Sequence, residues 1–315
     1  MKTVQEEYTF SKSEIRILKE LTKGERSLSD IEKSLSIKPP LLSYNLEKLL
    51  RKGIIKETAK GFRKHIQFND SKHASLLRDL LIIHDHVDWQ NLLTGKAIEI
   101  LFKAITDSGK EFSEIPKATL WRHLRNLKAH GILQRTKKGY SVNPRFPTLR
   151  DFLNEYQRFI INMLARTISE EAVVLWQRDF EFLVRAPKNI EATQKNFLCT
   201  ATSLLTNMGI PIFSEFDIYF YSKKKKNIQT EDIILHTLLI EPNNVRYVIY
   251  SLLLLKKYKE KIDIGYLMRE AQKYDLDSQI KGMLQFLETH TPQKDLPLPT
   301  WTEFEARARD YKVIT

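Results

Sequence analysis

Basic, hydroxyl and amide side chains recur in two segments of this 315-residue sequence, 78 positions apart. Arg and Asn can pair in a bidentate manner with the edges of guanine and adenine, and Lys and Arg bind phosphate through their charge. These residue types therefore indicate recognition of nucleic acid. The predicted contacts are Lys38, Ser43, Tyr44, Lys48, Arg51, Lys60, Arg63 and Lys64 in the first segment and Lys117, Thr119, Arg122, Arg125, Asn126, Arg135, Lys137 and Lys138 in the second.

The leucines of both segments are spaced so that they lie on one side of a helix. Recurrence at i, i+4 and i+7 places one apolar stripe on each helix, and at 100° per residue most of the basic and amide side chains point away from it. Each helix is expected to bury its leucines and to present a polar, basic outer face. The leucines are Leu42, Leu46 and Leu49 in the first segment and Leu120, Leu124 and Leu127 in the second.

The two segments align without a gap over residues 41–62 and 119–140. Gly53 aligns with Gly131, and a glycine in the left-handed conformation is typical of a helix end. Each of these glycines is followed by short β-rich runs on either side of a basic, glycine-containing turn, which predicts a β-hairpin. Two copies of one module, a helix followed by a hairpin, are the simplest interpretation.

The residues before the first copy complete an order of elements. Amphipathic patterns predict helices over residues 13–21 and 29–36, and Pro39 suits the first turn of a third helix. With the hairpin, residues 8–68 resemble the winged helix-turn-helix domains of bacterial and archaeal transcription regulators. Residues 94–146 resemble a second such domain, in which the stretch between the first and third helices is about five residues shorter and leaves about one turn for the second helix.

The resemblance implies that the third helices read duplex DNA and that the basic hairpins bind phosphate. The alternative is that the same faces are only solvated, or that they bind proteins, as some winged helices do. Trp121 flanks the apolar stripe of the second copy. For this side chain partial burial is expected rather than stacking on a base.

The distribution of charge agrees with a polyanionic partner for the N-terminal half. Residues 1–150 contain 29 Lys and Arg against 17 Asp and Glu, whereas residues 151–315 contain 22 of each, so the whole net charge of +12 lies in the first half. A localised positive field favours nucleic acid or an anionic membrane surface. Nucleic acid is favoured because the field coincides with the repeat.

Cysteine content and hydropathy bear on the compartment. Cys199 is the only cysteine, which excludes an intramolecular disulfide and any cysteine-based zinc finger. The N-terminus lacks the apolar run of a signal peptide, and no apolar run reaches the roughly 20 residues that span a bilayer. We expect a cytoplasmic protein without a membrane partner. No cofactor is expected, because the sequence has no nucleotide-binding glycine loop and no metal-binding HExxH or CxxC motif.

A helix that joins the two copies is predicted over residues 71–93, with an apolar face formed by Leu76, Leu77, Leu80, Leu81 and Ile83. The run from His84 to Asp88 contains two histidines at i and i+2, which do not share one helical face. Metal binding is therefore not expected there.

Residues 148–315 are expected to form one α+β domain with a helical end. A long amphipathic helix over residues 148–168 is expected to cover its core or, less commonly, to pair with a second copy. Strands are predicted at 172–176, 180–184 and 216–221, with a helix at 197–208. Four further helices are predicted at 230–240, 245–258, 264–274 and 278–290, and the tail after Pro292 is expected to be loosely ordered.

Residues 213–239 loosely resemble nucleotidyltransferase-like effector regions found in archaeal regulators and in abortive-infection antitoxins. Active members need a Gly-Ser turn and a spaced carboxylate pair. Glu215 and Asp217 have the spacing, but no Gly-Ser precedes them, so no catalysis is predicted. The four lysines from Lys223 to Lys226 are expected to be a solvated hairpin tip, with a phosphate contact as the alternative.

Together these patterns predict an α+β fold with winged helices at residues 8–70 and 94–146, a connecting helix at 71–93 and a C-terminal domain at 148–315. The leading interpretation is a transcription regulator that binds double-stranded DNA through two winged helices, with residues 148–315 for homodimerisation, an effector or a protein partner. The alternatives are an antitoxin-type repressor whose C-terminal domain binds a toxin, and a winged-helix scaffold for protein interactions.

Overall fold

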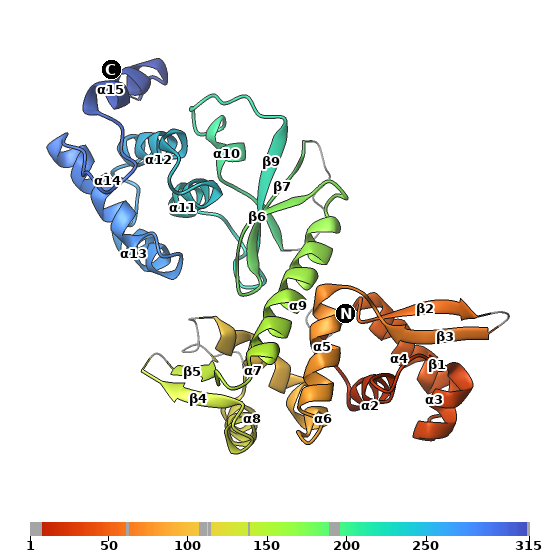
Figure 1. Cartoon of the computed structure of the whole chain (residues 1–315). Coiled ribbons are helices and arrows are strands. Elements are labelled where there is room, and N and C mark those ends of the chain that lie inside the picture. Colours follow the sequence, from red (N-terminus) through yellow and green to blue (C-terminus); the bar gives the residue numbers. More distant parts are fainter. Residues whose placement is uncertain are drawn as a thin grey trace. The chain divides into compact units, whose positions relative to one another are not determined.

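The computed structural model of the chain describes residues 8–60, 63–106, 112, 115–137, 139–188 and 196–313, and for Lys60 and Arg63 it describes the backbone alone. The fold is α+β, as predicted (Figure 1). The chain divides into two units, Met1–Ile160 and Ile161–Thr315. Each unit is described by itself below.

Side-chain caps and prolines set the starts of the first three helices. Helix α2 (Lys12–Leu21) begins at a capping box of Ser11 and Glu14, and α3 (Leu28–Leu35) begins at one of Ser27 and Asp30. Helix α4 (Pro39–Arg51) begins at the two prolines, which lack the N–H groups that a first turn leaves without a partner. All three helices agree with the sequence patterns.

The two strands after α4 belong to a three-stranded antiparallel sheet, whose third strand was not predicted. Strands β2 (Ile55–Lys60) and β3 (Arg63–Phe68) form the expected hairpin. Strand β1 (Arg26–Ser27) lies between α2 and α3 and pairs with β3, which gives the order β1-β3-β2. A strand of two residues has no period for a sequence pattern to detect.

The segment that joins the two copies is not one helix. Helix α5 (Lys72–Ile83) ends at His84, and a short helix α6 (Trp89–Leu92) follows after a turn. The turn is held by a hydrogen bond from the Trp89 indole Nε1 to the His84 carbonyl, 2.8 Å. The prediction of a continuous helix was wrong here, and Ile83, expected on the apolar face, is exposed.

The second copy has the predicted helix and hairpin. Helix α7 (Lys96–Ile105) is followed by α8 (Lys117–Ala129), and strands β4 (Leu133–Thr136) and β5 (Gly139–Val142) pair antiparallel. Between α7 and α8 the described residues form no helix. The predicted short helix near residues 113–116 falls mainly outside the described residues.

Helix α9 (Pro147–Arg166) is the predicted long helix, but it contributes to the core of the first unit. The Tyr156 hydroxyl donates to the Tyr8 carbonyl at 2.8 Å, and the Tyr156 ring lies against Phe10, Phe102 and Phe152. We expected this helix to cover the C-terminal core. For residues 147–160 that expectation was wrong, because the aromatic ring of Tyr156 packs in the core of the first unit.

A four-stranded antiparallel sheet opens the second unit. Its strands are β6 (Val173–Arg178), β7 (Glu181–Pro187), β8 (Phe197–Cys199) and β9 (Phe216–Tyr221), in the order β6-β7-β9-β8. The predicted helix at 197–208 was wrong in its first part, because residues 197–199 pair with β9 and only α10 (Thr202–Leu205) is helical.

Five helices of the second unit follow the sheet. They are α11 (Thr230–Ile240), α12 (Val245–Lys257), α13 (Ile264–Lys273), α14 (Asp277–Thr289) and α15 (Trp301–Asp310). The first four agree with the sequence patterns. Helix α15 lies in the tail that was expected to be loosely ordered; it begins at a capping box of Thr300 and Glu303, and it buries Phe304 against Phe286.

Candidate nucleic-acid interface

Helix α4 buries its leucines and exposes a polar face, as its spacing predicted. Leu42, Leu46 and Leu49 are buried. On the opposite face the Lys48 ammonium lies 4.7 Å from the centre of the Tyr44 ring, in a cation–π contact. The other predicted contacts of this helix, Lys38, Ser43 and Arg51, are exposed.

Several cations of the first copy already have carboxylate partners. Arg51 lies 3.1 Å from Glu47 on the same helix, and Lys64 on β3 lies 3.1 Å from Glu57 on β2. Lys56 pairs with Asp70. The hairpin of this copy is therefore less free to bind anions than its lysine content suggests.

One cation at the end of α4 is structural. Lys52 forms an ion pair with Glu14 of α2, with side-chain exposures of 1% and 0%, and its ammonium also lies 5.0 Å from the centre of the Phe10 ring. A buried charge is costly unless it is paired, so this pair fixes α4 to α2. Nothing in the sequence distinguished Lys52 from the surface lysines around it.

The C-terminal end of α4 is also held by aromatic residues. Gly53 adopts φ +62°, and a Cβ at this position would lie 2.9 Å from the Phe159 ring of α9. The centre of the His73 imidazole of α5 lies 4.4 Å from that of the same ring, at a tilt of 30°, and the imidazole hydrogen bonds to the Lys52 carbonyl at 3.1 Å. Burial lowers the pKa of His73. Helix α4 is thus held by α2, α5 and α9.

Helix α8 presents the corresponding face in the second copy. Leu124 and Leu127 are buried and Leu120 is half-buried, while Lys117, Arg122 and Arg125 are exposed and Thr119 and Asn126 are half-buried. The helix occupies the α4 positions shifted by 78 residues. The end of each helix is closed alike, by an Ile54 N–H to Leu49 carbonyl bond of 3.1 Å and an Ile132 N–H to Leu127 carbonyl bond of 2.9 Å.

Trp121 lies fully on the outside of α8, with an exposed fraction of 72%. The expectation of partial burial was wrong. It rested on the position of Trp121 beside the apolar stripe, but the helix turns its indole to solvent between Lys117 and Arg125, one turn away on either side. The second hairpin adds Arg135 and Lys137, both exposed, while Lys138 lies outside the described residues.

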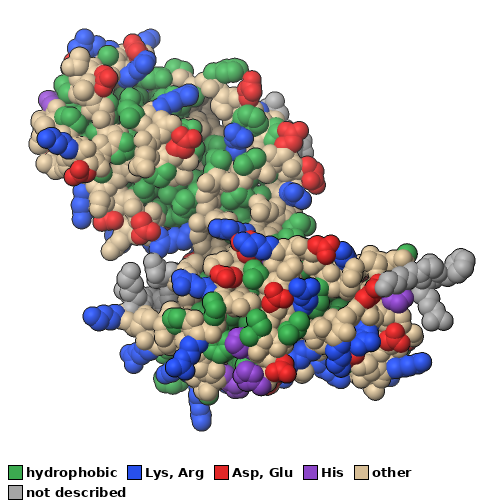
Figure 2. Space-filling model, in the orientation of Figure 1, with side chains coloured by type: hydrophobic (Ala, Val, Ile, Leu, Met, Phe, Trp, Pro, Cys, Tyr) green, Lys and Arg blue, Asp and Glu red, His purple; other side chains and the backbone are tan. Residues whose placement is uncertain are grey.

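Over α8 and the β4–β5 hairpin, the visible surface shows Lys and Arg side chains and no Asp or Glu (Figure 2).

The turn from His84 to Asp88 holds His84 against Phe146 and Trp89. Burial lowers the pKa of His84. In the described parts of the chain no group of three or more His, Cys, Asp or Glu side chains could hold a metal ion.

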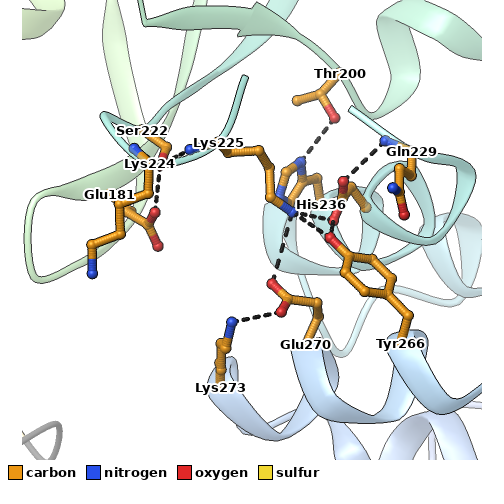
Figure 3. Close-up of polar contacts among 11 residues, drawn as sticks. Glu181, Thr200, Ser222, Lys224, Lys225, Gln229, His236, Tyr266, Glu270 and Lys273 are labelled. Atoms are coloured by element: carbon orange, nitrogen blue, oxygen red, sulfur yellow. Dashed lines mark hydrogen bonds and ion pairs between the residues drawn. The ribbon is translucent and has the colours of Figure 1, made fainter. Parts of the chain in front are cut away.

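The second unit contains a network of buried charged groups (Figure 3). Lys225, from the loop after β9, pairs with the fully buried Asp232 of α11 and donates to the Tyr266 hydroxyl at 2.9 Å. Glu270 lies 3.7 Å from Lys225 and 2.6 Å from Lys273. Although burial opposes it, hydrogen bonding to Asp232 and Tyr266 raises the pKa of Lys225.

This network corrects the expectation for the four lysines from Lys223 to Lys226. Lys225 is not a solvated side chain, because Asp232 and Tyr266 hold it in place. The loop that carries it is held by backbone N–H groups of Lys224 and Lys225, which donate to the Ser222 hydroxyl, and by that hydroxyl, which donates to Glu181. Lys225 thus attaches this loop to α11 through Asp232 and to α13 through Tyr266.

A buried histidine lies one helical turn from Asp232. The Nδ1 of His236 is 2.8 Å from the Thr200 hydroxyl, and its ring stacks on Phe220 at 4.2 Å. Its Nε2 is buried and has no hydrogen-bond partner in the structure as described. Burial lowers the pKa of His236 to about 3, so the ring is neutral at physiological pH.

Two family models match parts of the chain. The model of the bacterial regulatory protein arsR family matches residues 11–57. These residues contain α2, α3, α4 and the start of β2. A model named HVO_2833_C, for a C-terminal domain, matches residues 194–313. Comparisons with curated proteins and with solved structures found no match.

The arsR match indicates a DNA-binding transcription regulator, and it fits a protein that is not an enzyme. The match ends before the second copy, so any assignment of DNA binding to α8 and its hairpin depends on the geometry of these elements alone. The C-terminal match gives no support for an antitoxin or a nucleotidyltransferase. Among the residues that the structure describes, none of the helices combines the length and apolar character needed to cross a bilayer.

Proposed function

We propose that the chain is a transcription regulator that binds duplex DNA through two winged helices, residues 8–70 and 94–146, while residues 148–315 serve dimerisation, an effector or a protein partner. The observation that carries the proposal is the arsR match over residues 11–57, because it falls on the helices α2, α3 and α4, and α4 exposes Tyr44 with the half-buried Lys48 over its ring.

The second winged helix is proposed from its likeness to the first. Helix α8 repeats α4 at an offset of 78 residues, has its own hairpin and exposes Arg122 and Arg125. In this proposal the two helices contact base edges in the major groove, and the hairpins bind phosphate. The hairpin contacts are Lys60, Arg63, Lys64, Arg135, Lys137 and Lys138.

Selection of genomic DNA tests the proposal. The full-length protein is incubated with sheared duplex DNA from its source organism, and the bound fragments are sequenced at two salt concentrations. We expect enriched fragments that share a sequence and lie upstream of genes. The matched control is the variant with Arg122, Arg125, Lys137 and Lys138 changed to Glu, which is expected to lose this enrichment. If no duplex is retained even at low salt, the proposal is wrong.

The two alternatives predict other outcomes of the same experiment. An antitoxin-type repressor would enrich the promoter of its own operon and would copurify with a toxin bound to residues 148–315. A protein-interaction scaffold would enrich no DNA. No feature of the described residues favours either alternative over the regulator.

A further inference from the structure

The two helix–hairpin copies differ in whether their Lys and Arg side chains are paired with carboxylates. We define the second basic face as the exposed side chains of Lys117, Arg122, Arg125 and Lys128 on α8 and of Arg135 and Lys137 on the hairpin. None of these six has a carboxylate partner within the described residues. From Ile115 to Arg150 the sequence contains no Asp or Glu at all.

The corresponding surface of the first copy contains acidic residues at equivalent positions. Glu47 of α4 is equivalent to Arg125, and Glu57 of β2 is equivalent to Arg135, each at the offset of 78 residues. These same carboxylates pair with Arg51 and Lys64 in the first copy. A phosphate that approaches the first copy must therefore displace a carboxylate or lie beside it, and either reduces the electrostatic gain.

Trp121 gives a second reason to regard the second basic face as a contact surface. It replaces Ser43 of the first copy and is the most exposed tryptophan or tyrosine of this unit among the residues described. At 72% exposure the indole is accessible for stacking on a base, and such stacking on aromatic side chains is a common way in which proteins bind nucleic acid. With Lys117 and Arg125 one turn on either side, an anionic partner with planar groups fits it best, and nucleic acid has both properties.

We infer that the second copy, outside the arsR match, supplies most of the phosphate binding, and that the first copy contributes mainly by placing α4. This inference rests on the proposed function and assigns its main surface to residues 117–137. Trp121 then contacts the bound nucleic acid directly. A cation that is already paired with a carboxylate neutralises less phosphate charge than an unpaired one, and it therefore releases fewer counterions from the DNA. The two copies should thus differ in their contribution to the salt dependence of binding.

Two matched double variants test the inference in the full-length protein. Arg125→Gln with Arg135→Gln removes two unpaired cations, and Arg51→Gln with Lys64→Gln removes two paired ones, in each case one from the helix and one from the hairpin. Fluorescence anisotropy with a labelled duplex gives log K at several salt concentrations. The slope against log salt is expected to fall by about 1.8 in the first variant, at about 0.9 per phosphate contact, and by less than half of this in the second.

The outcomes separate the inference from the proposed function. If the wild-type protein binds no duplex, the proposed function fails. If it binds but the Arg51 and Lys64 variant loses as much slope as the other, the inference is wrong. Tryptophan fluorescence gives a second readout: binding should change the emission of the wild type and not that of Trp121→Phe. An equal change in both would place the nucleic acid away from α8 and would also overturn the inference.

Discussion

At the scale of single residues, equal residue types have unequal roles. Lys48 lies in the last turn of α4 and Lys52 directly follows the helix, yet Lys52 is buried against Glu14 while Lys48 is half-buried and lies over the exposed Tyr44. The sequence could not separate them, because the partner of Lys52 lies on another helix, 38 residues earlier. Burial of a charge depends on a tertiary contact, which helical spacing does not contain.

The two helix-ending glycines allow a matched test of packing around α4. Both adopt positive φ, so Ala at either position costs about 1 kcal/mol in backbone strain. At Gly131 an added Cβ meets nothing within 4 Å, whereas at Gly53 it would lie 2.9 Å from Phe159. We expect Gly53→Ala to lower the free energy of unfolding by at least about 1 kcal/mol more than Gly131→Ala, because the ring must also move.

Denaturant unfolding of the two glycine variants and of the wild type measures this difference. The Gly131→Ala variant is the control for backbone strain alone. Equal losses in the two variants would show that Phe159 does not restrain the end of α4.

The buried His236 predicts an acid-side loss of stability in the second unit. Its pKa is about 3 in the folded state, below the 6.5 of an unfolded histidine, so the unfolded chain binds the proton first as the pH falls. Stability from this group is complete above pH 6.5 and is lost below it. Between pH 7.5 and pH 5 the loss is about 2 kcal/mol.

The variant His236→Gln removes this titration. Denaturant unfolding at both pH values should show a stability difference between wild type and variant that shrinks by about 2 kcal/mol at pH 5. His73, which is also buried, titrates in both proteins and therefore cancels in the comparison. Parallel losses in the two proteins would contradict the assignment to His236.

At the scale of elements, the sequence predicted those with a long regular period. Helix α11 and strand β9 have the predicted bounds, and helices α4 and α8 form where the leucine spacing indicated a helix. The elements that the sequence did not predict are short, or they form only because of contacts with residues far away in the chain. Strands β1 and β8 exist because β3 and β9 offer an edge for pairing.

The prediction for the segment that forms α15 was wrong for a different reason. The prolines and polar residues after Pro292 suggested a loose tail, but Phe304 and Ala308, one turn apart, are buried in the core of the second unit. Two apolar residues on one side of a helix are a weak signal in sequence and a sufficient one in a packed structure.

For the candidate interface, the sequence predicted which side chains are exposed but not which of them are paired. Periodicity predicted that Arg122 and Arg125 point outward, and the structure has them exposed. It could not predict that Arg51 and Lys64 of the first copy are paired with carboxylates, because pairing depends on which side chains meet across strands or turns. The assignment of these residues as DNA contacts stays a prediction.

At the scale of the whole molecule, the net charge of +12 is confined to residues 1–150, where two helix–hairpin copies lie. Residues 151–315 contain as many acidic as basic side chains, and the buried network around Lys225 and Asp232 stabilises the fold rather than forming a surface. The two halves therefore have different physical properties, and only the first is suited to a polyanion.

The central claim is that this chain recognises a particular duplex sequence. The direct measurement is the ratio of its affinities for an enriched genomic fragment and for a shuffled duplex of equal length and composition, by fluorescence anisotropy at physiological salt. The account predicts that the fragment binds tighter by about 10³-fold or more. Equal affinity for the two duplexes, or no binding to either at low salt, would contradict it.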